Sequence, residues 1–461
     1  MSGGVGPIDS VLEAIGRTPL VRLTRVTRGL RTPVLGKAEY LNPGGSVKDR
    51  IGLAIIEAFE RSGELQPGGT IVEGTSGNTG VGLAIAAAIR GYRCVFTIPD
   101  KMSSEKIRLL RAYGAEVVVV PTAVPPDHPE YYVNKAQAIV AATPGAVLAN
   151  QHFNPVNPEA HYRTTGPEIW EGTDGQVTHF VCSPGTGGTV SGVGRYLKER
   201  NPRVRVIAPD PVGSIYAEYA RSHTKSEGFP YKVEGVGGDK IPTSLHFDVI
   251  DEFVTVSDAD AFRMARRLTR EEGLFVGGST GLNVAAALEV ARRVDDPGAL
   301  VVTVLCDTGE RYLSKVYDDE WMRENQMLEQ VHLTAGSLLE ARPAGLPPIV
   351  SVPPAAGVRQ ALNLMSTYGI SEIPVLDGAD CVGSLSEEPL MARVLADRGL
   401  VERRVSEVMR PPFPVVDAGA PLERLLTLLA RDSTAVLVRR DGALAGIVTR
   451  YDVLRHVAGI R

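Results

Sequence analysis

Residues 42–50 read Asn-Pro-Gly-Gly-Ser-Val-Lys-Asp-Arg, and the apolar run at 51–59 that follows them predicts a helix. Proline fixes φ and glycine permits positive φ, so this turn can direct the first helical residues to one confined point. A lysine at that point, Lys48, could act as a desolvated amine with a lowered pKa, suited to forming a Schiff base. The alternative is a solvated surface lysine, and the rest of the sequence decides between them.

Strand and helix patterns alternate outward from Lys48. Apolar runs predict strands at 20–23, 34–38, 70–74, 93–98, 116–120, 146–149, 178–182, 204–208 and 300–305, and helical patterns cover 48–61, 78–91, 104–113, 131–142, 189–199, 258–272 and 280–293. The runs at 94–98 and 117–120 are apolar on both faces, which is typical of parallel strands covered by helices. We therefore expect an α/β domain at 1–325 with two lobes, a mobile lobe at about 42–150, and a ligand cleft between them.

The composition is that of an ordinary globular protein. The chain has 461 residues, of which 43% are hydrophobic and 22% charged, and its net charge is −5. This balance favours neither nucleic acid nor an anionic membrane as a partner. The sequence shows no signal-peptide pattern, no apolar run of about 18 residues and no CxxC spacing among its four cysteines. We expect a cytoplasmic protein with reduced thiols and no metal site.

Three glycine-rich or hydroxyl-rich loops precede predicted helices. Gly185-Thr186-Gly187-Gly188-Thr189 can hold a phosphate dianion at a helix N-terminus, although an ordinary βα turn would look similar. The spacing is not GxGxxG, and the Lys48 segment lacks the Gly-Lys-Ser/Thr of a P-loop. The loop at 75–79 contains residues typical of a helix N-cap, and Ser279 is another such residue. The N–H groups and hydroxyls of the loop at 75–79 could also form a nest that binds a carboxylate.

Seven segments in one order resemble the pyridoxal-phosphate β-replacement enzymes, the cysteine synthase and cystathionine β-synthase group. They are GRTPLV at 16–21, the Lys48 segment, EGTSGNTG at 73–80, KMSSEK at 101–106, PGTGGT at 184–189, EGVG at 234–237 and GGSTG at 277–281. The resemblance covers nearly all of residues 8–325. It implies the two-lobed fold type II, like the tryptophan synthase β chain, and pyridoxal 5′-phosphate as the cofactor.

The resemblance also implies roles for individual residues. Lys48 would bind the cofactor aldehyde and act as the catalytic base. The cofactor would be held by Asn78 at the ring hydroxyl, by Gly185, Thr186, Gly187, Gly188 and Thr189 at the phosphate, and by Ser279 at the ring nitrogen. The substrate would be bound by Thr75, Ser76, Thr79, Gln151 and Gly235. A neutral hydroxyl at the ring nitrogen would make the ring a modest electron sink, which favours loss of a β-substituent over transamination.

The C-terminal part differs in character. Residues 326–348 end in a Pro-rich run and predict a linker. Beyond it, 373–386 and 436–449 form a repeat of about 63 residues, each copy a strand pair around Asp-Gly, with helices at 358–368 and 422–430. This α+β unit at 349–461, with copies at about 349–400 and 405–461, resembles a pair of CBS motifs, the regulatory module that binds adenosyl compounds.

One adenosyl site is expected in that pair. Thr449 and Asp452 match the Thr-x-x-Asp pair that contacts ribose in such modules, although an exposed aspartate at a helix start is equally common. In the first copy Ser386 matches, but Pro389 stands at the acidic position. S-adenosylmethionine is the leading ligand, and an adenine nucleotide is the alternative.

Three features favour cystathionine β-synthase within the group: KMSSEK at 101–106, DPVGSI at 210–215 and the CBS-motif pair. The reaction would join serine and homocysteine to cystathionine and water, a step of transsulfuration. Animal and yeast members carry a tyrosine where this chain has Gly238, which leaves the homocysteine side of the site open. No Cys or His precedes Gly16, so we expect no haem.

Alternatives to this assignment remain. They are a cysteine synthase using O-acetylserine and sulfide, a serine or threonine dehydratase, and a metabolite sensor with vestigial catalysis. The complete set of Lys48, Asn78, the 185–189 loop and Ser279 argues against the sensor. A homodimer is the default of the group, and a homotetramer is the other possibility.

Overall fold

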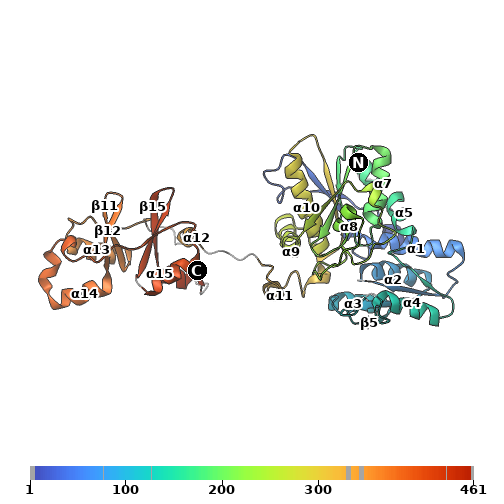
Figure 1. The fold of residues 1–461 in the computed structure, drawn as a ribbon, viewed down its shortest axis with the longest axis horizontal. Coiled ribbons are helices and arrows are strands. Elements are labelled where there is room, and N and C mark those ends of the chain that lie inside the picture. The colour runs from blue at the N-terminus through green and yellow to red at the C-terminus, as the bar shows by residue number, and fades with distance from the viewer. Residues whose placement is uncertain are drawn as a thin grey trace. The chain divides into compact units, whose positions relative to one another are not determined.

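The computed structural model describes residues 6–75, 77–125, 127–328, 334–341, 347–431 and 433–457. The chain divides into two compact units, Met1–Glu329 and Gln330–Arg461 (Figure 1). None of the helices in these described ranges is both long and apolar enough to cross a membrane.

The N-terminal unit contains two sheets. The larger has the strand order β1 (Leu20–Arg22), β2 (Val34–Ala38), β10 (Val301–Leu305), β7 (His179–Val181), β8 (Arg205–Pro211) and β9 (Glu252–Val256). β1 pairs antiparallel with β2, and the other neighbours pair in parallel. β10 is buried along its whole length. Its successive side chains enter two different cores, because neighbouring residues of a strand point to opposite faces.

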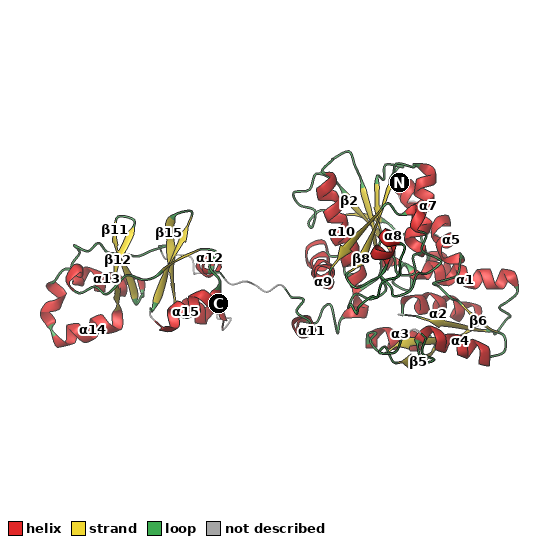
Figure 2. Cartoon of the chain, in the orientation of Figure 1, coloured by secondary structure: helices red, strands yellow, loops and turns green. Residues whose placement is uncertain are grey.

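Helices cover both faces of this larger sheet (Figure 2). α9 (Asp258–Arg267) and α10 (Gly278–Val294) pack on one face, and α7 (Gly188–Arg200) packs on the other. The shorter elements around them are η1 (Val11–Ala14), η2 (Glu39–Leu41), α5 (Val156–Arg163), α6 (Thr165–Gly172), α8 (Tyr216–Ser222), η3 (Phe247–Val249), η4 (Leu268–Glu272), η5 (Gly309–Tyr312) and α11 (Asp319–Glu324).

The smaller sheet is parallel throughout, with the order β5 (Glu116–Val120), β4 (Arg93–Pro99), β3 (Thr70–Gly74) and β6 (Ala146–Leu148). α1 (Lys48–Ser62), α2 (Asn78–Arg90), α3 (Ser104–Ala112) and α4 (Tyr132–Ala142) belong to this lobe. β3 is buried at every residue, as expected for a parallel strand with both faces covered. The α/β class expected from the sequence is therefore confirmed.

Helices α1 and α2 touch backbone to backbone. A Cβ atom added at Gly52 would lie 2.6 Å from the Leu83 nitrogen, and one added at Gly82 would lie 2.6 Å from the Lys48 carbonyl oxygen. Any larger residue would push the helices apart, since neither obstacle is a flexible side chain. The first residues of both helices, Lys48 and Asn78, are held together by this contact.

The sequence patterns missed the short elements β9, α5 and α6. Pro158 lies inside α5 and Pro167 inside α6, so each of these helices contains a residue that usually ends a helical pattern. The predicted helix at 258–272 is divided in the structure. α9 ends at Arg267, and the last turn, η4, is a π-helix.

A buried network of charges lies under the start of α1. Arg50 contacts Glu39 at 2.7 Å and Glu168 at 2.7 Å, and Lys37 contacts Glu168 at 2.5 Å. Thr18 donates a hydrogen bond to Glu39 at 2.7 Å. Burial alone would raise the pKa of Glu168, but hydrogen bonds from Arg50 and Lys37 and the charge of Arg50 lower it to about 2. The network ties β2, η2, α1 and α6 together.

In the C-terminal unit, β11 (Glu372–Asp377) pairs antiparallel with β12 (Asp380–Ser386), and β14 (Ala435–Arg440) with β15 (Ala443–Thr449). Both pairs have a register shift, at Val375/Leu376 in the first pair and at Val438/Arg439 in the second. These positions are 63 residues apart, so the sequence repeat is matched by a repeated irregularity in the strand pairing. The other elements are β13 (Val415–Asp417), α13 (Val358–Tyr368), α14 (Glu387–Ala396), η6 (Arg398–Glu402), η7 (Val405–Glu407), α15 (Leu422–Arg431) and α16 (Arg450–Val457).

The segment 326–348, expected to be a linker, contains helix α12 (Ala335–Glu340). Ala335 and Gly336 donate backbone hydrogen bonds to Ala420 at 2.9 Å and Ala418 at 2.8 Å. Ala335 and Leu338 are buried in the core of the second repeat. These six residues are therefore part of the C-terminal unit, and a six-residue helix is too short for its period to be read reliably from a sequence.

Replacing Arg50 with Met should lower the free energy of unfolding by about 3–5 kcal/mol, because Glu39 and Glu168 would lose their buried partner. Both tryptophans, Trp170 and Trp321, lie in the N-terminal unit, so tryptophan fluorescence during urea unfolding reports on this unit. The exposed Arg31, paired with Asp295, is a matched control, and Arg31→Met should change stability by less than about 1 kcal/mol. Equal effects of both changes would contradict a structural role for the network.

Candidate active site

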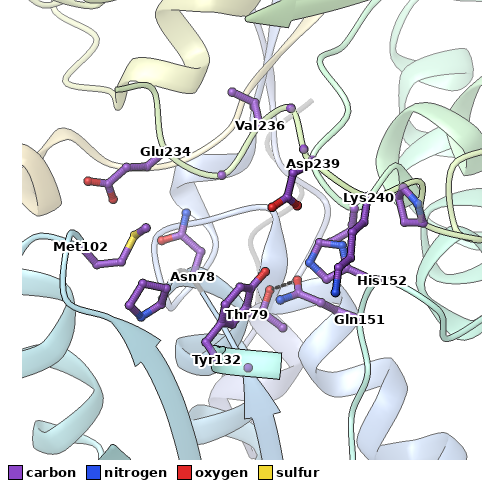
Figure 3. Close-up of a pocket in the computed structure, with 18 of the residues that line it drawn as sticks. Asn78, Thr79, Met102, Tyr132, Gln151, His152, Glu234, Val236, Asp239 and Lys240 are labelled. Atoms are coloured by element: carbon purple, nitrogen blue, oxygen red, sulfur yellow. Dashed lines mark hydrogen bonds between the residues drawn. The ribbon is translucent and has the colours of Figure 1, made fainter. Parts of the chain in front are cut away.

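A cavity of about 860 Å³ opens in the N-terminal unit, where helix N-termini and strand ends of both sheets meet (Figure 3). Its lining includes ten of the residues predicted from the sequence: Lys48, Asn78, Thr79, Gln151, Gly185, Thr186, Gly187, Thr189, Gly235 and Ser279. Gly188 is the first residue of α7. The buried Thr75 hydroxyl accepts the Gly77 N–H at 3.0 Å. Ser76 lies outside the described residues.

Lys48 is the first residue of α1 and lines the cavity. Its backbone N–H donates to the Ser46 hydroxyl at 3.2 Å. Burial lowers the pKa of His152 to about 4 and the pKa of His161 to about 3. For both histidines, the positive charge of the Lys48 side chain is the second largest cause of this lowering. Both imidazoles are therefore neutral near pH 7.

The loop before α7 is shaped as a cradle that requires glycine. A Cβ atom at Gly185 would overlap the Gly235 carbonyl oxygen, and one at Gly188 would overlap the Asn157 side chain. Gly187 has a φ of +87°, and a Cβ atom there would overlap Leu245. The first N–H groups of α7 and the two hydroxyls of this loop surround the hollow, which matches what a phosphate dianion needs.

Neighbouring polar groups orient the hydroxyls of the cradle. Asn157 donates to Thr186 at 2.8 Å, and the His161 Nε2 lies 3.2 Å from the Thr189 hydroxyl. The other ring nitrogen of His161 is 2.9 Å from Thr165. Ser183 also lines the cavity, and its buried hydroxyl has no hydrogen-bond partner among the described residues. The cradle thus offers a spare donor, and its residues fit a bound phosphate.

At another part of the lining, Ser279 lies in the first turn of α10, next to Cys306. Burial raises the pKa of the Cys306 thiol to about 12, so the thiol stays protonated. A hydrogen bond between the two side chains acts in the opposite direction. Both lining groups here are uncharged, which suits a ring nitrogen that is not held protonated.

The amide of Asn78 is fixed from the opposite lobe. Its Nδ2 donates to Asp307 at 2.7 Å, and its Oδ1 accepts a hydrogen bond from Arg311. Tyr312 also donates to Asp307, at 2.6 Å, and Arg311 also contacts the Gly44 carbonyl. Since an amide nitrogen has two hydrogens, the second remains available to a ligand in the cavity.

Sequence reasoning missed Glu73, the buried residue at the start of the EGTSGNTG segment. Its carboxyl accepts the backbone N–H groups of Asn150 at 2.6 Å and Gln151 at 3.4 Å, while the Thr79 hydroxyl donates to the Gln151 side chain at 2.5 Å. Burial raises the pKa of Glu73 to about 8, against these hydrogen bonds. An acidic residue in a wholly buried strand was the signal that could have identified it.

Gly238, the residue noted in the sequence analysis as a departure from the family pattern, lines the cavity. A Cβ atom at this position would lie 2.7 Å from the Cζ atom of Tyr216. Tyr216 is buried, and its hydroxyl donates to the Gly185 carbonyl at 2.9 Å. The phenol of Tyr216, from α8, therefore occupies the space into which a side chain at 238 would extend. The sequence alone did not reveal this contact.

In the C-terminal unit the two predicted regulatory residues lie together at the start of α16. The Thr449 N–H and hydroxyl both contact Asp452 Oδ2 at 2.7 Å. The equivalent Ser386 of the first copy instead donates to Glu372 at 2.6 Å. The two copies thus differ at this position in their contacts as well as in sequence.

Comparison with known proteins agrees with the fold and the cavity. The pyridoxal-phosphate dependent enzyme family matches residues 11–307, and the CBS domain family matches 345–388 and 405–459. The fold and site are thus those of a pyridoxal-phosphate dependent enzyme with two CBS domains.

Relatives narrow this class. Cystathionine beta-synthase from Oryctolagus cuniculus is 37% identical over 470 residues, covering 98% of this chain and 85% of that protein. The enzyme of the same name from Dictyostelium discoideum is 35% identical over 463 residues, covering 98% of this chain and 92% of that protein. The chain belongs to the cystathionine β-synthase family of pyridoxal-phosphate dependent β-synthases, as the sequence motifs indicated.

Solved structures resemble the N-terminal part. An O-acetylserine dependent cystathionine beta-synthase from Helicobacter pylori has a TM-score of 0.62 and 38% identity, covering 68% of this chain and 99% of that chain. An O-ureido-L-serine synthase has a TM-score of 0.62 and 39% identity, covering 69% of this chain and 100% of that chain. An enzyme named for its donor and an enzyme named for its product thus share this fold.

Replacing Glu73 with Gln should flatten the dependence of stability on pH. Because the pKa in the folded protein, about 8, exceeds the ordinary value of 4.5, the folded state retains a proton that the unfolded chain releases. This contribution to stability is full below about pH 4.5 and is lost as pH rises through about 8. Urea unfolding followed by tryptophan fluorescence at about pH 5 and about pH 8 would measure the slope. An unchanged slope in the variant would show that Glu73 does not titrate in this way.

Proposed function

We propose that the protein joins L-serine and L-homocysteine to form cystathionine and water, and that its CBS-domain pair binds an adenosyl ligand that regulates this reaction. The observation that carries the proposal is the meeting of Lys48, Asn78, Ser279 and the 185–189 cradle at one cavity. The chain that holds them aligns along 98% of its length with proteins named cystathionine beta-synthase. We further propose a cytoplasmic homodimer as the working form.

Each residue then has a definite task. When bound, pyridoxal phosphate withdraws electrons from the Cα atom of an amino acid joined to it, which allows loss of the Cα proton and of a β-substituent. The 185–189 cradle would hold the phosphate, Asn78 the ring hydroxyl and Ser279 the ring nitrogen. The Lys48 amine would carry the resting cofactor, accept the Cα proton of serine and later return it.

The substrate carboxylate would bind beside the cofactor, at the start of α2. Thr79 and Gln151 are joined by a hydrogen bond of 2.5 Å, and Glu73 holds the backbone of Gln151 in place. With Thr75 and Ser76, these groups would orient serine so that its Cα–H bond faces Lys48. The β-hydroxyl would leave as water with the proton that the homocysteine thiol gives up, and the resulting thiolate would bond to the β-carbon.

A second candidate is a β-synthase that uses O-acetylserine as the donor, with sulfide as the acceptor in the cysteine synthase case. One observation supports it: the similar solved structures include an O-acetylserine dependent cystathionine beta-synthase. The residues proposed to bind the cofactor are the same in both cases. The two candidates differ only in the leaving group and the acceptor.

The visible spectrum of the purified protein tests the proposal. We expect an absorption band of lysine-bound cofactor that shifts when serine is added and returns when homocysteine follows, while mass spectrometry detects cystathionine. A band that ignores serine but responds to O-acetylserine would favour the second candidate. Absence of any band after cofactor addition would contradict both.

Lys48→Ala should abolish the lysine-bound band and lower turnover by several orders of magnitude, because the variant lacks both the covalent anchor and the base. Lys225→Ala is the matched control. Lys225 is an exposed lysine outside the cavity, and its loss should leave the spectrum unchanged. Circular dichroism of both variants would show that the fold is retained. Normal turnover by Lys48→Ala would refute the assignment.

Asp452→Ala should weaken S-adenosylmethionine binding about tenfold in calorimetric titration, because a carboxylate contact to the ribose would be lost. Asp452 also caps α16 through Thr449, so loss of the cap could mimic this effect. Asp452→Asn keeps a capping group and removes only the charge. Asp397→Ala removes a cap elsewhere in the same unit, where Asp397 accepts the Gly399 N–H at 2.9 Å. Equal affinities in all four proteins would remove Asp452 from the binding site.

A further inference from the structure

The outer part of the cavity carries a group of polar side chains that the cofactor and serine do not use. Tyr131, His152, Asp239 and Lys240, here called the outer wall, all line the cavity. Figure 3 shows Asp239 and Lys240 on the loop that carries Val236, with His152 beside Lys240. This loop is also the one that holds Gly235 and Gly238.

Lys240 is held at the mouth of the cavity by an aromatic ring. Its Nζ atom lies 4.6 Å from the centre of the Tyr131 ring, within the range of a cation–π interaction. Burial is the largest cause of the lowered pKa of His152, and the charges of Lys48 and Lys240 lower it further. His152 thus lines the cavity at a place where the charges of both lysines act on it.

Asp239 supplies the opposite charge in the same place. Burial together with the charge of Asp239 raises the pKa of Tyr131 to about 12, and the same carboxylate contributes to the raised pKa of Tyr132. The outer wall therefore presents a carboxylate and an ammonium group on consecutive residues. An α-amino acid carries the complementary pair, an ammonium and a carboxylate on one carbon.

Gly238 lines this part of the cavity without adding a side chain to it. Residue 238 has no side chain, and the phenol of Tyr216 fills the adjacent space from α8 instead. The donor carboxylate has its own proposed site at Thr79 and Gln151, inside the cavity. A second amino-acid head group at the outer wall would not compete with the first.

We propose that Lys240 and Asp239 determine the specificity for the acceptor, by binding the α-carboxylate and α-ammonium groups of an amino-acid thiol. The site would then select such a thiol over hydrosulfide or over a thiol without a head group. This inference rests on the proposed function, because it assigns the acceptor side of the same reaction. The groups act on binding of the acceptor and not on its chemistry, so they should affect KM more than kcat.

Steady-state kinetics of the full-length holoenzyme would test the proposed acceptor specificity. Serine is the donor in each assay, and homocysteine and propanethiol are compared as acceptors. Lys240→Gln should raise the KM for homocysteine about fivefold, the range of a partly exposed ion pair, with kcat nearly unchanged. The KM for propanethiol should stay at the wild-type value. Lys240→Arg should restore most of the preference for homocysteine, and Lys225→Gln removes the same charge outside the cavity as the control.

A binding measurement separates the acceptor site from turnover. Borohydride reduction would fix the cofactor to Lys48, and saturating serine would occupy the donor site, after which calorimetry measures homocysteine binding alone. Lys240→Gln and Asp239→Asn should each weaken this binding about fivefold relative to Lys225→Gln. Equal affinity in all proteins, or an equal loss of activity with homocysteine and propanethiol, would overturn the inference.

The outcomes also separate the inference from the proposed function. Wild-type protein that forms cystathionine, together with a Lys240→Gln variant of unchanged acceptor preference, would overturn only the role of Lys240. Wild-type protein that leaves homocysteine unused with serine and with O-acetylserine would contradict the proposed function, and the inference with it.

Discussion

The close contact between α1 and α2 is the constraint on which the cavity depends. Because Gly52 and Gly82 lack side chains, the two helix backbones touch, and their first residues, Lys48 and Asn78, open into the same space. Two helix N-termini side by side also place two positive dipole ends there. A cofactor with a phosphate and an amino acid with a carboxylate are both anionic, so this geometry favours them before any side chain acts.

The three residues at the start of α1 fix the rotation of this helix. Lys48 lines the cavity, Asp49 accepts the Gly44 N–H at 2.5 Å, and Arg50 joins the buried network with Glu39 and Glu168. Burial raises the pKa of Asp49 to about 7, against that hydrogen bond and the charge of Arg311. A small rotation of α1 would break the contacts of both neighbours. The position of Lys48 is therefore set by charged groups that do not line the cavity.

The sequence predicted what depends on local pattern. The α/β class, most strands and the loops before α1, α2, α7 and α10 follow from apolar runs, glycines and cap residues that are near each other in the chain. Glu73, His161 and Tyr216 were missed, because their roles come from contacts with residues far away, such as Tyr216 with Gly185. Helix α12 was missed because its partners, Ala418 and Ala420, lie in the second repeat.

The parts of the site differ in how firmly they are held. Gly187, Gly188 and Ser279 are surrounded by buried groups, so few substitutions would preserve them. Asp239 and Lys240 are exposed at the mouth and can change without disturbing the core. Solved relatives named for O-acetylserine and for O-ureido-L-serine share the fold of this unit. In this chain the groups proposed to hold the cofactor are fixed by close packing, whereas the groups proposed to select the acceptor lie on a loop at the surface.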